Sequence, residues 1–448
     1  MRVGIAWECP WVPSSYGKLS LWLASELQRM GVDVRVYCPS APETQLYSNR
    51  ALYKPECLHE ELGICVELEK PVEVYNAGWL CEDEDVDVYV VCGAPYGATE
   101  SEWIARCSKS SKPVAGYFVT ESAIVPSSLA NWLFLVDAVG FTTRAVARAY
   151  LVHDAVREFH SDWVLVPHGL PEYYFKLDPE KVFEYNMELY RKRGLSDNPG
   201  LKLVLESRSE GVLYGMVGKD HPRKDYGALL SAFALLKRLC MERWGFCDKV
   251  RLLLGFVKAV GVPTWQVNML MDLLGLESND VVILAEEFQR RGITEMALLF
   301  LYSAIDAFVF ATMGEGWGLP PLEAATLGRP IVVTKTPVTE EVWDGYPLLA
   351  ESRPLVFPEG HILYQTDYRD LAEKMATLLS SCDRRRYGRL ARQVAERYTA
   401  RRMAESFLKL VDLAMQRCGV KKQYPLEKLL TQITGGYRSV VLEVLKLA

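Results

Sequence analysis

Short segments that are apolar at almost every position alternate with amphipathic segments, and this alternation restricts the fold more than any other feature. The segments 87–92 (DVYVVC) and 114–119 (VAGYFV) are typical. Strands of this kind are buried on both faces, as in a parallel sheet that helices cover. Repeated strand–helix–strand units therefore predict a doubly wound α/β fold.

The alternation runs through the chain twice, which predicts two domains with parallel sheets. The first set covers residues 1–175 and the second covers 201–383, separated by a charged helical linker at 176–200 that ends in SDNPG. Residues 384–448 form a helical tail, which we expect to pack back on the first lobe. Ligands of open α/β sheets bind beyond the carboxyl ends of the strands. Two Rossmann-like lobes thus predict a binding cleft between them.

Charge and hydropathy exclude some classes of partner. The 448 residues carry a formal net charge of −6, so we expect no nucleic-acid binding through a basic face. The amino terminus lacks the long apolar run of a secretory signal, and no stretch approaches ~18 apolar residues. We therefore expect a cytoplasmic protein without a transmembrane segment. An amphipathic segment at 421–448 fits a packing helix or, alternatively, a peripheral membrane contact.

The eleven cysteines contain no CxxC pair, which makes a zinc site improbable on spacing. Asparagine and glutamine together number only 16, a weak sign of a thermophilic source. Intracellular disulfides do occur in hyperthermophiles, and the candidate pairs are Cys57 with Cys65 and Cys240 with Cys247.

The segment 313–333 (MGEGWGLPPLEAATLGRPIVV) holds the most informative motif, a loop between two predicted strands. Its alternating glycines allow close approach of backbone to a ligand. Two prolines then suit the first turn of a helix, whose amino terminus attracts anions. Glu315 lies in the loop and Glu323 lies eight positions later on the helix. Carboxylates at these positions can accept hydrogen bonds from sugar hydroxyls.

A second segment, 214–237, places three basic residues within six positions between a strand and a helix. Lys219, Arg223 and Lys224 could neutralise a diphosphate, which needs cationic and N–H donors. The alternative interpretation is a solvated basic loop. In either case we expect Lys224 to lie in a polar loop outside the core.

The motif GEGWGLPPLEA resembles the signature of retaining GT-B glycosyltransferases, and most of all glycosyltransferase family 4, the glycosyl transferases group 1. The resemblance implies a GT-B fold with an acceptor-side first lobe and a second lobe that binds a nucleotide sugar. It implies retaining transfer of a hexose from a nucleotide-diphosphate sugar to a hydroxyl acceptor, which could be a sugar, a lipid-linked sugar or a glycan. No metal and no other cofactor is expected.

The resemblance also implies roles for individual residues. Glu323 would hold the ribose hydroxyls and Glu315 the transferred sugar, while Lys224, with Arg223 or Lys219, would neutralise the diphosphate leaving group. Lys219 stands where the family usually has Arg, so the division of work between Lys219 and Arg223 stays open. The remaining donor-binding candidates are Gly17, Gly316, Trp317, Gly318 and Leu319.

Three further segments have weaker signals. Gly17 lies in a predicted strand-to-helix turn, where relatives contact donor phosphate or acceptor. Glu121 (YFVTES) is a candidate contact on the sugar or acceptor side. His168 (VPHGL) is expected to be a structural residue between the lobes. Asp85-Val-Asp87 has the form of a metal motif but is expected to be the solvated start of a strand.

Two other functions remain as alternatives. A nucleotide-sugar epimerase could use the same fold, although the GEGWG loop argues against it. A catalytically inactive GT-B binding protein is the other alternative, and the intact Glu315, Glu323 and Lys224 argue against that.

Overall fold

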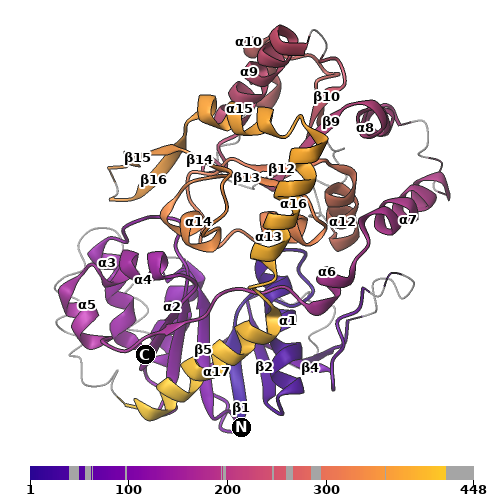
Figure 1. Cartoon of the computed structure of the whole chain (residues 1–448). Coiled ribbons are helices and arrows are strands. Elements are labelled where there is room, and N and C mark those ends of the chain that lie inside the picture. The colour runs from indigo at the N-terminus through magenta and orange to yellow at the C-terminus, as the bar shows by residue number, and fades with distance from the viewer. Residues whose placement is uncertain are drawn as a thin grey trace.

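The computed structural model describes residues 1–39, 50–55, 62, 64–95, 98–192, 194, 198–244, 247–258, 266–283, 294–358 and 360–419. These residues form two α/β lobes, one above the other in Figure 1. The predicted amphipathic segment at 421–448 lies outside the described residues. Within the described part, no helix is both long and apolar enough to cross a membrane.

The first lobe is built on an eight-stranded sheet with the order β3-β4-β2-β1-β5-β6-β7-β8. Every neighbouring pair is parallel except β3 with β4. The strands are β1 Arg2–Ala6, β2 Asp33–Cys38, β3 Arg50–Tyr53, β4 Val72–Asn76, β5 Val88–Gly93, β6 Val114–Phe118, β7 Ala138–Phe141 and β8 Val164–Leu165. The strand order reverses between β1 and β5, which is where α/β sheets bind ligands.

The second lobe repeats this design with the parallel order β11-β10-β9-β12-β13-β14. Its strands are β9 Val212–Asp220, β10 Val250–Lys258, β11 Val281–Ile283, β12 Ala307–Phe310, β13 Ile331–Thr334 and β14 Leu349–Ala350. An antiparallel hairpin, β15 Ser352–Val356 with β16 Ile362–Thr366, projects beside it (Figure 1). Two doubly wound sheets confirm the predicted α/β fold class.

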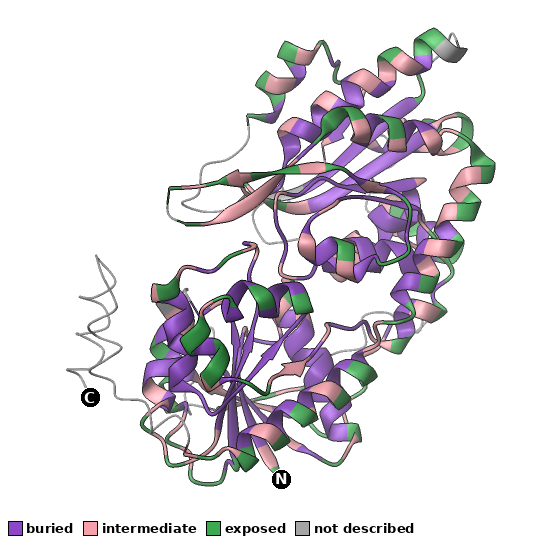
Figure 2. Ribbon diagram, turned by 60° about the vertical axis from the view of Figure 1, so that its left-hand side comes forward, coloured by how far each residue is buried: buried purple, intermediate pink, exposed green. Residues whose placement is uncertain are grey.

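Helices cover the sheets, so the strands are buried on both faces, as Figure 2 shows in purple. β5, β6 and β7 are buried at every position. The helices of the first lobe are α1 Ser15–Arg29, α2 Ala98–Cys107, α3 Ser127–Ala130, α4 Arg144–Leu151 and α5 Asp154–Phe159. Those of the second lobe are α9 Tyr226–Trp244, α10 Val267–Leu274, α12 Glu295–Ala304, α13 Leu319–Thr326, α14 Pro337–Val342 and α15 Tyr368–Thr377.

The segment between the lobes holds three helices, α6 Glu172–Lys176, α7 Pro179–Lys192 and α8 Pro199–Glu210. The sequence predicted a charged helical stretch that ends in SDNPG, and α7 does end before this motif, but α8 after it was not predicted. Asn198 caps the amino terminus of α8, because its side chain accepts a hydrogen bond from Leu201 N–H at 3.1 Å. Asn198 and Pro199 therefore begin a second helix.

The described part of the tail holds α16 Ser381–Ala395 and α17 Ala400–Gln416. α17 packs on α1 and on the sheet of the first lobe, as expected, whereas α16 packs on α13 of the second lobe (Figure 1). The chain thus crosses between the lobes twice, and the two crossings pair. Leu170 N–H donates to Tyr398 O at 3.0 Å, and Ala400 N–H donates to Leu170 O at 2.8 Å. A Cβ on Gly169 would lie 2.1 Å from Thr399 O, so only glycine permits this pairing.

Three disulfides join described cysteines, namely Cys9–Cys38, Cys81–Cys107 and Cys240–Cys247. The last is one of the two candidate pairs from the sequence, and it is confirmed. Cys65 is also disulfide-bonded, but Cys57, its candidate partner, lies outside the described residues.

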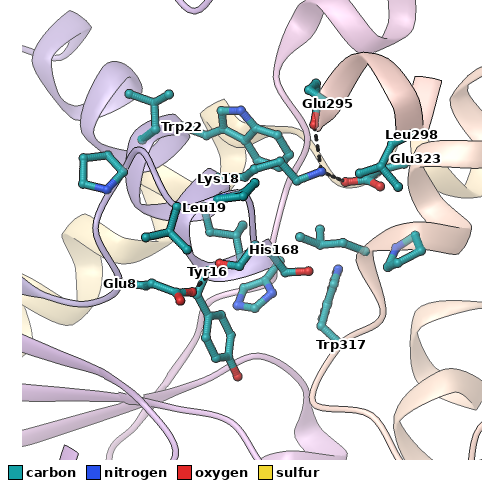
Figure 3. Close-up of a pocket in the computed structure, with 18 of the residues that line it drawn as sticks. Glu8, Tyr16, Lys18, Leu19, Trp22, His168, Glu295, Leu298, Trp317 and Glu323 are labelled. Carbon is teal, nitrogen blue, oxygen red and sulfur yellow. Dashed lines mark hydrogen bonds and ion pairs between the residues drawn. The ribbon is translucent and has the colours of Figure 1, made fainter. Parts of the chain in front are cut away.

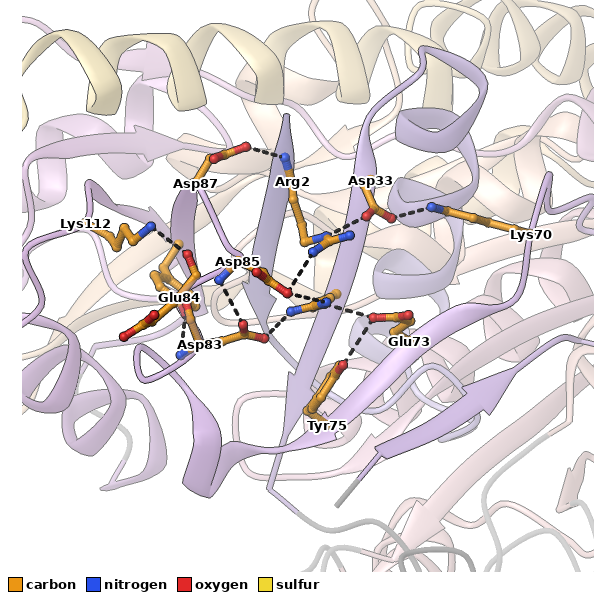
Figure 4. A network of polar contacts seen from close by, with 12 residues as sticks. Arg2, Asp33, Lys70, Glu73, Tyr75, Asp83, Glu84, Asp85, Asp87 and Lys112 are labelled. Atoms are coloured by element: carbon orange, nitrogen blue, oxygen red, sulfur yellow. Dashed lines mark hydrogen bonds and ion pairs between the residues drawn. The ribbon is translucent and has the colours of Figure 1, made fainter. Parts of the chain in front are cut away.

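A network of charged side chains lies at the amino ends of β1, β2 and β5 (Figure 4). Asp87 accepts a hydrogen bond from Arg2 N–H at 2.7 Å, and Asp85 lies 3.4 Å from the Arg2 guanidinium. This edge is opposite to the carboxyl ends of the strands. The DxD-like pair therefore belongs to the start of β5, as predicted, and helps to join three strands.

Candidate active site

A cavity of about 1530 Å³ lies between the lobes, at the carboxyl ends of both sheets. It is lined from the first lobe by residues that follow β1, in α1 and after β6. From the second lobe it is lined by the end of β9 and by the loop that joins β12 to α13. The charged residues that line it include Glu8, Lys18, Glu121, Lys224, Glu315 and Glu323. Both lobes thus bring their ligand-binding edges to one cleft, as the two-sheet pattern predicts.

Glu315 is the centre of a buried ionic cluster at the bottom of this cleft. Its Oε1 accepts hydrogen bonds from Thr312 Oγ1 at 2.7 Å, from Arg223 Nη1 at 2.5 Å and from Lys224 Nζ. The side chains of Glu315 and Lys224 are only 8% and 6% exposed. The structure therefore brings Glu315 of one sequence motif together with Arg223 and Lys224 of the other, which lie 92 and 91 positions before it in the chain.

Burial and charge determine the ionisation of this cluster. Burial alone would raise the pKa of Glu315, but Arg223 and Lys224 hold it below its usual value. Burial lowers the pKa of Lys224 to about 8, because desolvation and the neighbouring Arg223 outweigh the attraction of Glu315. Two cations face the buried Glu315 here, and Glu121 of the first lobe pairs with Arg223 as the second carboxylate. An anionic ligand at this site would therefore compete with Glu121 for Arg223.

Lys224 lies in the polar loop between β9 and α9, as expected, but it is buried, which contradicts the expectation that it lies outside the core. It is 5% exposed, and its Nζ lies 4.2 Å from the centroid of the Phe310 ring. The sequence motif is polar on both sides of Lys224, but the chain turns inward there, and Asp225 N–H donates to Ala311 O at 3.2 Å.

The glycines of the loop allow the lobes to approach each other. A Cβ on Gly314 would lie 2.1 Å from Glu121 O, across the interface between the lobes. Gly316 O accepts a hydrogen bond from Thr142 Oγ1 of the first lobe at 2.7 Å. Gly318 has φ +91° and caps α13 without a side chain. The amino end of α13 is therefore open to the cleft, as an anion site requires.

Glu323 lies on α13 and forms a second buried cluster, shown in Figure 3. Lys18 Nζ, from α1 of the first lobe, lies 2.5 Å from Glu323 Oε1 and 3.0 Å from Glu295 Oε2. Tyr302 OH donates to Glu323 Oε2 at 2.7 Å. The carboxylate predicted to bind ribose is therefore held by a lysine of the opposite lobe.

The remaining predicted residues lie around these clusters. Arg223 also contacts Glu121, whereas Lys219 lies exposed at the carboxyl end of β9 and lines the cleft. Gly316, Trp317, Gly318 and Leu319 line the cleft as well. His168 packs between the Trp7, Tyr117 and Trp317 rings, and burial lowers its pKa to about 3. A neutral, buried histidine fits the predicted structural role.

Gly17 differs from its prediction. The expected turn is absent at this position, because α1 begins at Ser15 with Ser14 as its cap, and Gly17 lies in the first helical turn. It is buried, it is not among the residues that line the cleft, and a Cβ there would lie 2.3 Å from Val12 O. Its physical role is close packing of α1 on the preceding loop.

Sequence reasoning missed Lys18, Glu295 and Thr312. Lys18 and Glu323 are 305 positions apart, and only the docking of the two lobes brings them together. Glu295 follows Thr294, a helix cap, and an acidic residue at the start of a helix has an ordinary structural explanation. No local signal in the sequence distinguishes these residues from ordinary polar residues of the surface.

Two Rossmann-type lobes with an ionic cleft between them define a protein of the GT-B class. The family described as Glycosyl transferases group 1 matches residues 213–381, which cover most of the second lobe. The second lobe thus matches a glycosyltransferase family, and the two-lobe arrangement is the GT-B fold.

A curated relative also resembles part of this chain in sequence. A segment of 149 residues is 29% identical to the serotype-specific mannosyltransferase WbdA of Escherichia coli, which covers 33% of this chain and 16% of that protein. The chain thus matches about a sixth of the length of this curated relative.

Solved structures share the fold over nearly the whole chain. The sucrose-phosphate synthase from Thermosynechococcus elongatus aligns with a TM-score of 0.61 at 14% identity, covering 92% of this chain and 98% of that one. A glycosyltransferase from Rickettsia africae aligns with a TM-score of 0.59 at 14% identity, covering 93% and 99%. A UDP-forming trehalose-phosphate synthase from Burkholderia xenovorans aligns with a TM-score of 0.60 at 12% identity, covering 92% and 98%.

Proposed function

We propose that the protein is a retaining glycosyltransferase that moves a hexose from a nucleotide-diphosphate sugar to a hydroxyl acceptor, without a metal ion. The buried cluster of Glu315 with Arg223 and Lys224 is the observation that carries this proposal. It places two fixed cations and one carboxylate together at the edge where both sheets open into the cleft.

The cluster suits the charges that change during transfer. The bond between the sugar anomeric carbon and the diphosphate oxygen breaks, and the leaving diphosphate keeps the electron pair. Arg223 and Lys224 stabilise the negative charge that develops there, and Glu315 stabilises the positive charge of the sugar ring. The acceptor oxygen forms the new bond on the same face, and its proton passes to the leaving phosphate oxygen.

The other residues of the cleft bind the donor in this proposal. Glu323 accepts hydrogen bonds from the ribose hydroxyls, and the loop from Gly316 to Leu319 contacts the donor through backbone N–H groups. The first lobe, with Glu121 at its edge, presents the acceptor. Mannose is the first sugar to test, because the curated relative is named a mannosyltransferase.

The test is release of nucleoside diphosphate from GDP-mannose, UDP-glucose and other nucleotide sugars, with and without a panel of saccharide and lipid-linked acceptors. We expect release that depends on acceptor and a product of unchanged anomeric configuration. Sugar interconversion without acceptor would instead indicate an epimerase. Tight nucleotide binding without any turnover would indicate a binding protein.

A further inference from the structure

Lys18 joins the two lobes through two carboxylates of the second lobe. Its Nζ lies 2.5 Å from Glu323 Oε1 and 3.0 Å from Glu295 Oε2 (Figure 3). The two carboxylates are buried, with exposed side-chain fractions of 1% for Glu323 and 8% for Glu295, and Lys18 is mostly buried at 16%. A buried ammonium cannot lose its carboxylate without a replacement, since an unpaired charge away from water is strongly unfavourable.

In each carboxylate, the oxygen that faces away from Lys18 accepts hydrogen bonds from different tyrosines. Glu323 Oε2 accepts from Tyr302 OH at 2.7 Å, and Glu295 Oε1 accepts from Tyr174 OH and, at 3.3 Å, from Tyr173 OH. Both carboxylates therefore stay fixed when Lys18 moves. The oxygens that face Lys18 are the ones that can change partner.

Glu295 Oε2 is the second partner of Lys18. It is buried and lies 3.0 Å from Lys18 Nζ, and within the described residues no other group donates to it. An ammonium group carries three donors, so Lys18 can serve both carboxylates. The lysine therefore keeps one carboxylate partner if it loses the other.

We infer that Lys18 and Glu295 are positioning residues for the ribose of the donor: Lys18 occupies Glu323 until the ribose diol arrives, and Glu295 then holds Lys18. This inference rests on the proposed function, in which Glu323 binds ribose. The hydroxyls replace the ammonium on Glu323 Oε1, and Lys18 stays paired with Glu295 Oε2. No charge is left unpaired, and the link between the lobes is kept. The pair thereby makes binding selective for nucleotides with an intact ribose diol.

The experiment compares nucleoside diphosphates (ADP, GDP and UDP) with their 2′,3′-dideoxy forms, by calorimetry on the full-length protein and four variants. Glu295→Gln keeps size but removes the charge that receives Lys18. It should weaken binding of the best ribonucleotide at least tenfold and leave its dideoxy form within twofold. Lys18→Met/Glu295→Gln removes the competitor as well, so ribonucleotide affinity should return to within threefold of the original protein.

Glu341→Gln is the matched control. Glu341 also links the lobes, because it accepts hydrogen bonds from Arg144 N–H and Ala145 N–H, but it does not line the cleft. This variant should bind both nucleotides with the affinity of the original protein. The inference would be overturned if Glu295→Gln lost the same affinity for both nucleotides or lost none for either. It would also be overturned if the double variant did not recover its affinity for the ribonucleotide. If Glu295→Gln does not fold, the double variant decides, because it must still prefer ribose over dideoxyribose at least as strongly as the original protein.

Glu323→Ala separates this inference from the proposed function. If Glu323→Ala loses its preference for ribonucleotides while Glu295→Gln binds them as the original protein does, the role of Lys18 and Glu295 is refuted but the role of Glu323 is kept. Absence of nucleotide binding by the original protein would refute the proposed function itself.

Discussion

Arg223 Nε of the second lobe lies 3.1 Å from Glu121 Oε1 of the first lobe, so this arginine is paired with carboxylates of both lobes. The side chain of Glu121 is 38% exposed, so solvent screens this pair, whereas Glu315 is only 8% exposed. In the proposed donor complex, Glu121 would compete with the diphosphate for Arg223.

Glu121→Gln should consequently tighten binding of a nucleoside diphosphate. A half-exposed ion pair stabilises by ~0.2–1 kcal/mol, so the dissociation constant should fall by about 1.4- to fivefold. Calorimetry at low salt measures it, with Glu341→Gln as the control between lobes. A weaker complex would instead assign Glu121 to a direct contact with the ligand.

The pH dependence of kcat/KM should report Lys224. Its ammonium is the active form, and the pKa of about 8 in the free protein lies below the usual 10.5. Activity should therefore be constant below pH 8 and fall as pH rises through 8, where Lys224 loses its proton. Lys224→Arg should move this alkaline limb upward, because a guanidinium stays charged. An alkaline limb at the same pH in Lys224→Arg would assign it to another group.

The fold was predictable where burial is uniform along a strand. β5 and β6 are apolar throughout, and the sequence identifies both. β4 alternates buried and half-buried residues, and β3 is an edge strand with Leu52 62% exposed, so neither has the pattern of a buried strand. The hairpin β15–β16 is likewise half-exposed.

The candidate site was predictable only in part. Glu315, Arg223 and Lys224 lie in motifs whose glycines and clustered charges stand out locally. Lys18 does not stand out in this way, because it contacts Glu323 only where the two lobes meet. Contacts of this kind depend on the relative placement of the lobes, which no local pattern encodes.

Transfer should proceed without a divalent metal ion. In the proposed mechanism Arg223 and Lys224 supply the positive charge that a metal would otherwise give to the diphosphate. Turnover in excess EDTA should therefore equal turnover in magnesium or manganese, measured on protein stripped of metal. Complete loss in the chelator, restored by either ion, would contradict this prediction.

The disulfide Cys9–Cys38 should stabilise the first lobe. It joins the ends of β1 and β2 and closes a loop of 29 residues, for which the loss of unfolded-state entropy corresponds to roughly 3–4 kcal/mol. Cys9→Ala/Cys38→Ala should lower the free energy of unfolding by about that amount in denaturant titrations. Cys92→Ala, which removes a buried cysteine that is not in a disulfide, is the control. Equal losses in the two variants would mean that packing, and not the cross-link, stabilises.

Glu315→Gln should keep the fold and the binding of nucleoside diphosphate but lose most sugar transfer. Glutamine keeps the size of Glu315 and an oxygen that can accept from Thr312, so the loop should retain its conformation. Glu315 also raises the pKa of Lys224, and this contribution is lost in the variant, but a bound diphosphate supplies negative charge beside Lys224 in its place. Nucleoside diphosphate should therefore still bind.

The transition state responds differently from the ground state. There the sugar ring becomes oxocarbenium-like and positive, so a buried carboxylate stabilises it more than the bound substrate. Loss of one such interaction typically lowers the rate by ~10²–10³. Residual product should keep the anomeric configuration of the donor, because the mechanism uses no carboxylate as a base on the opposite face of the ring. Proton NMR of the product on a defined acceptor decides the configuration, and an inverted anomer or normal turnover of Glu315→Gln would refute the role assigned to Glu315.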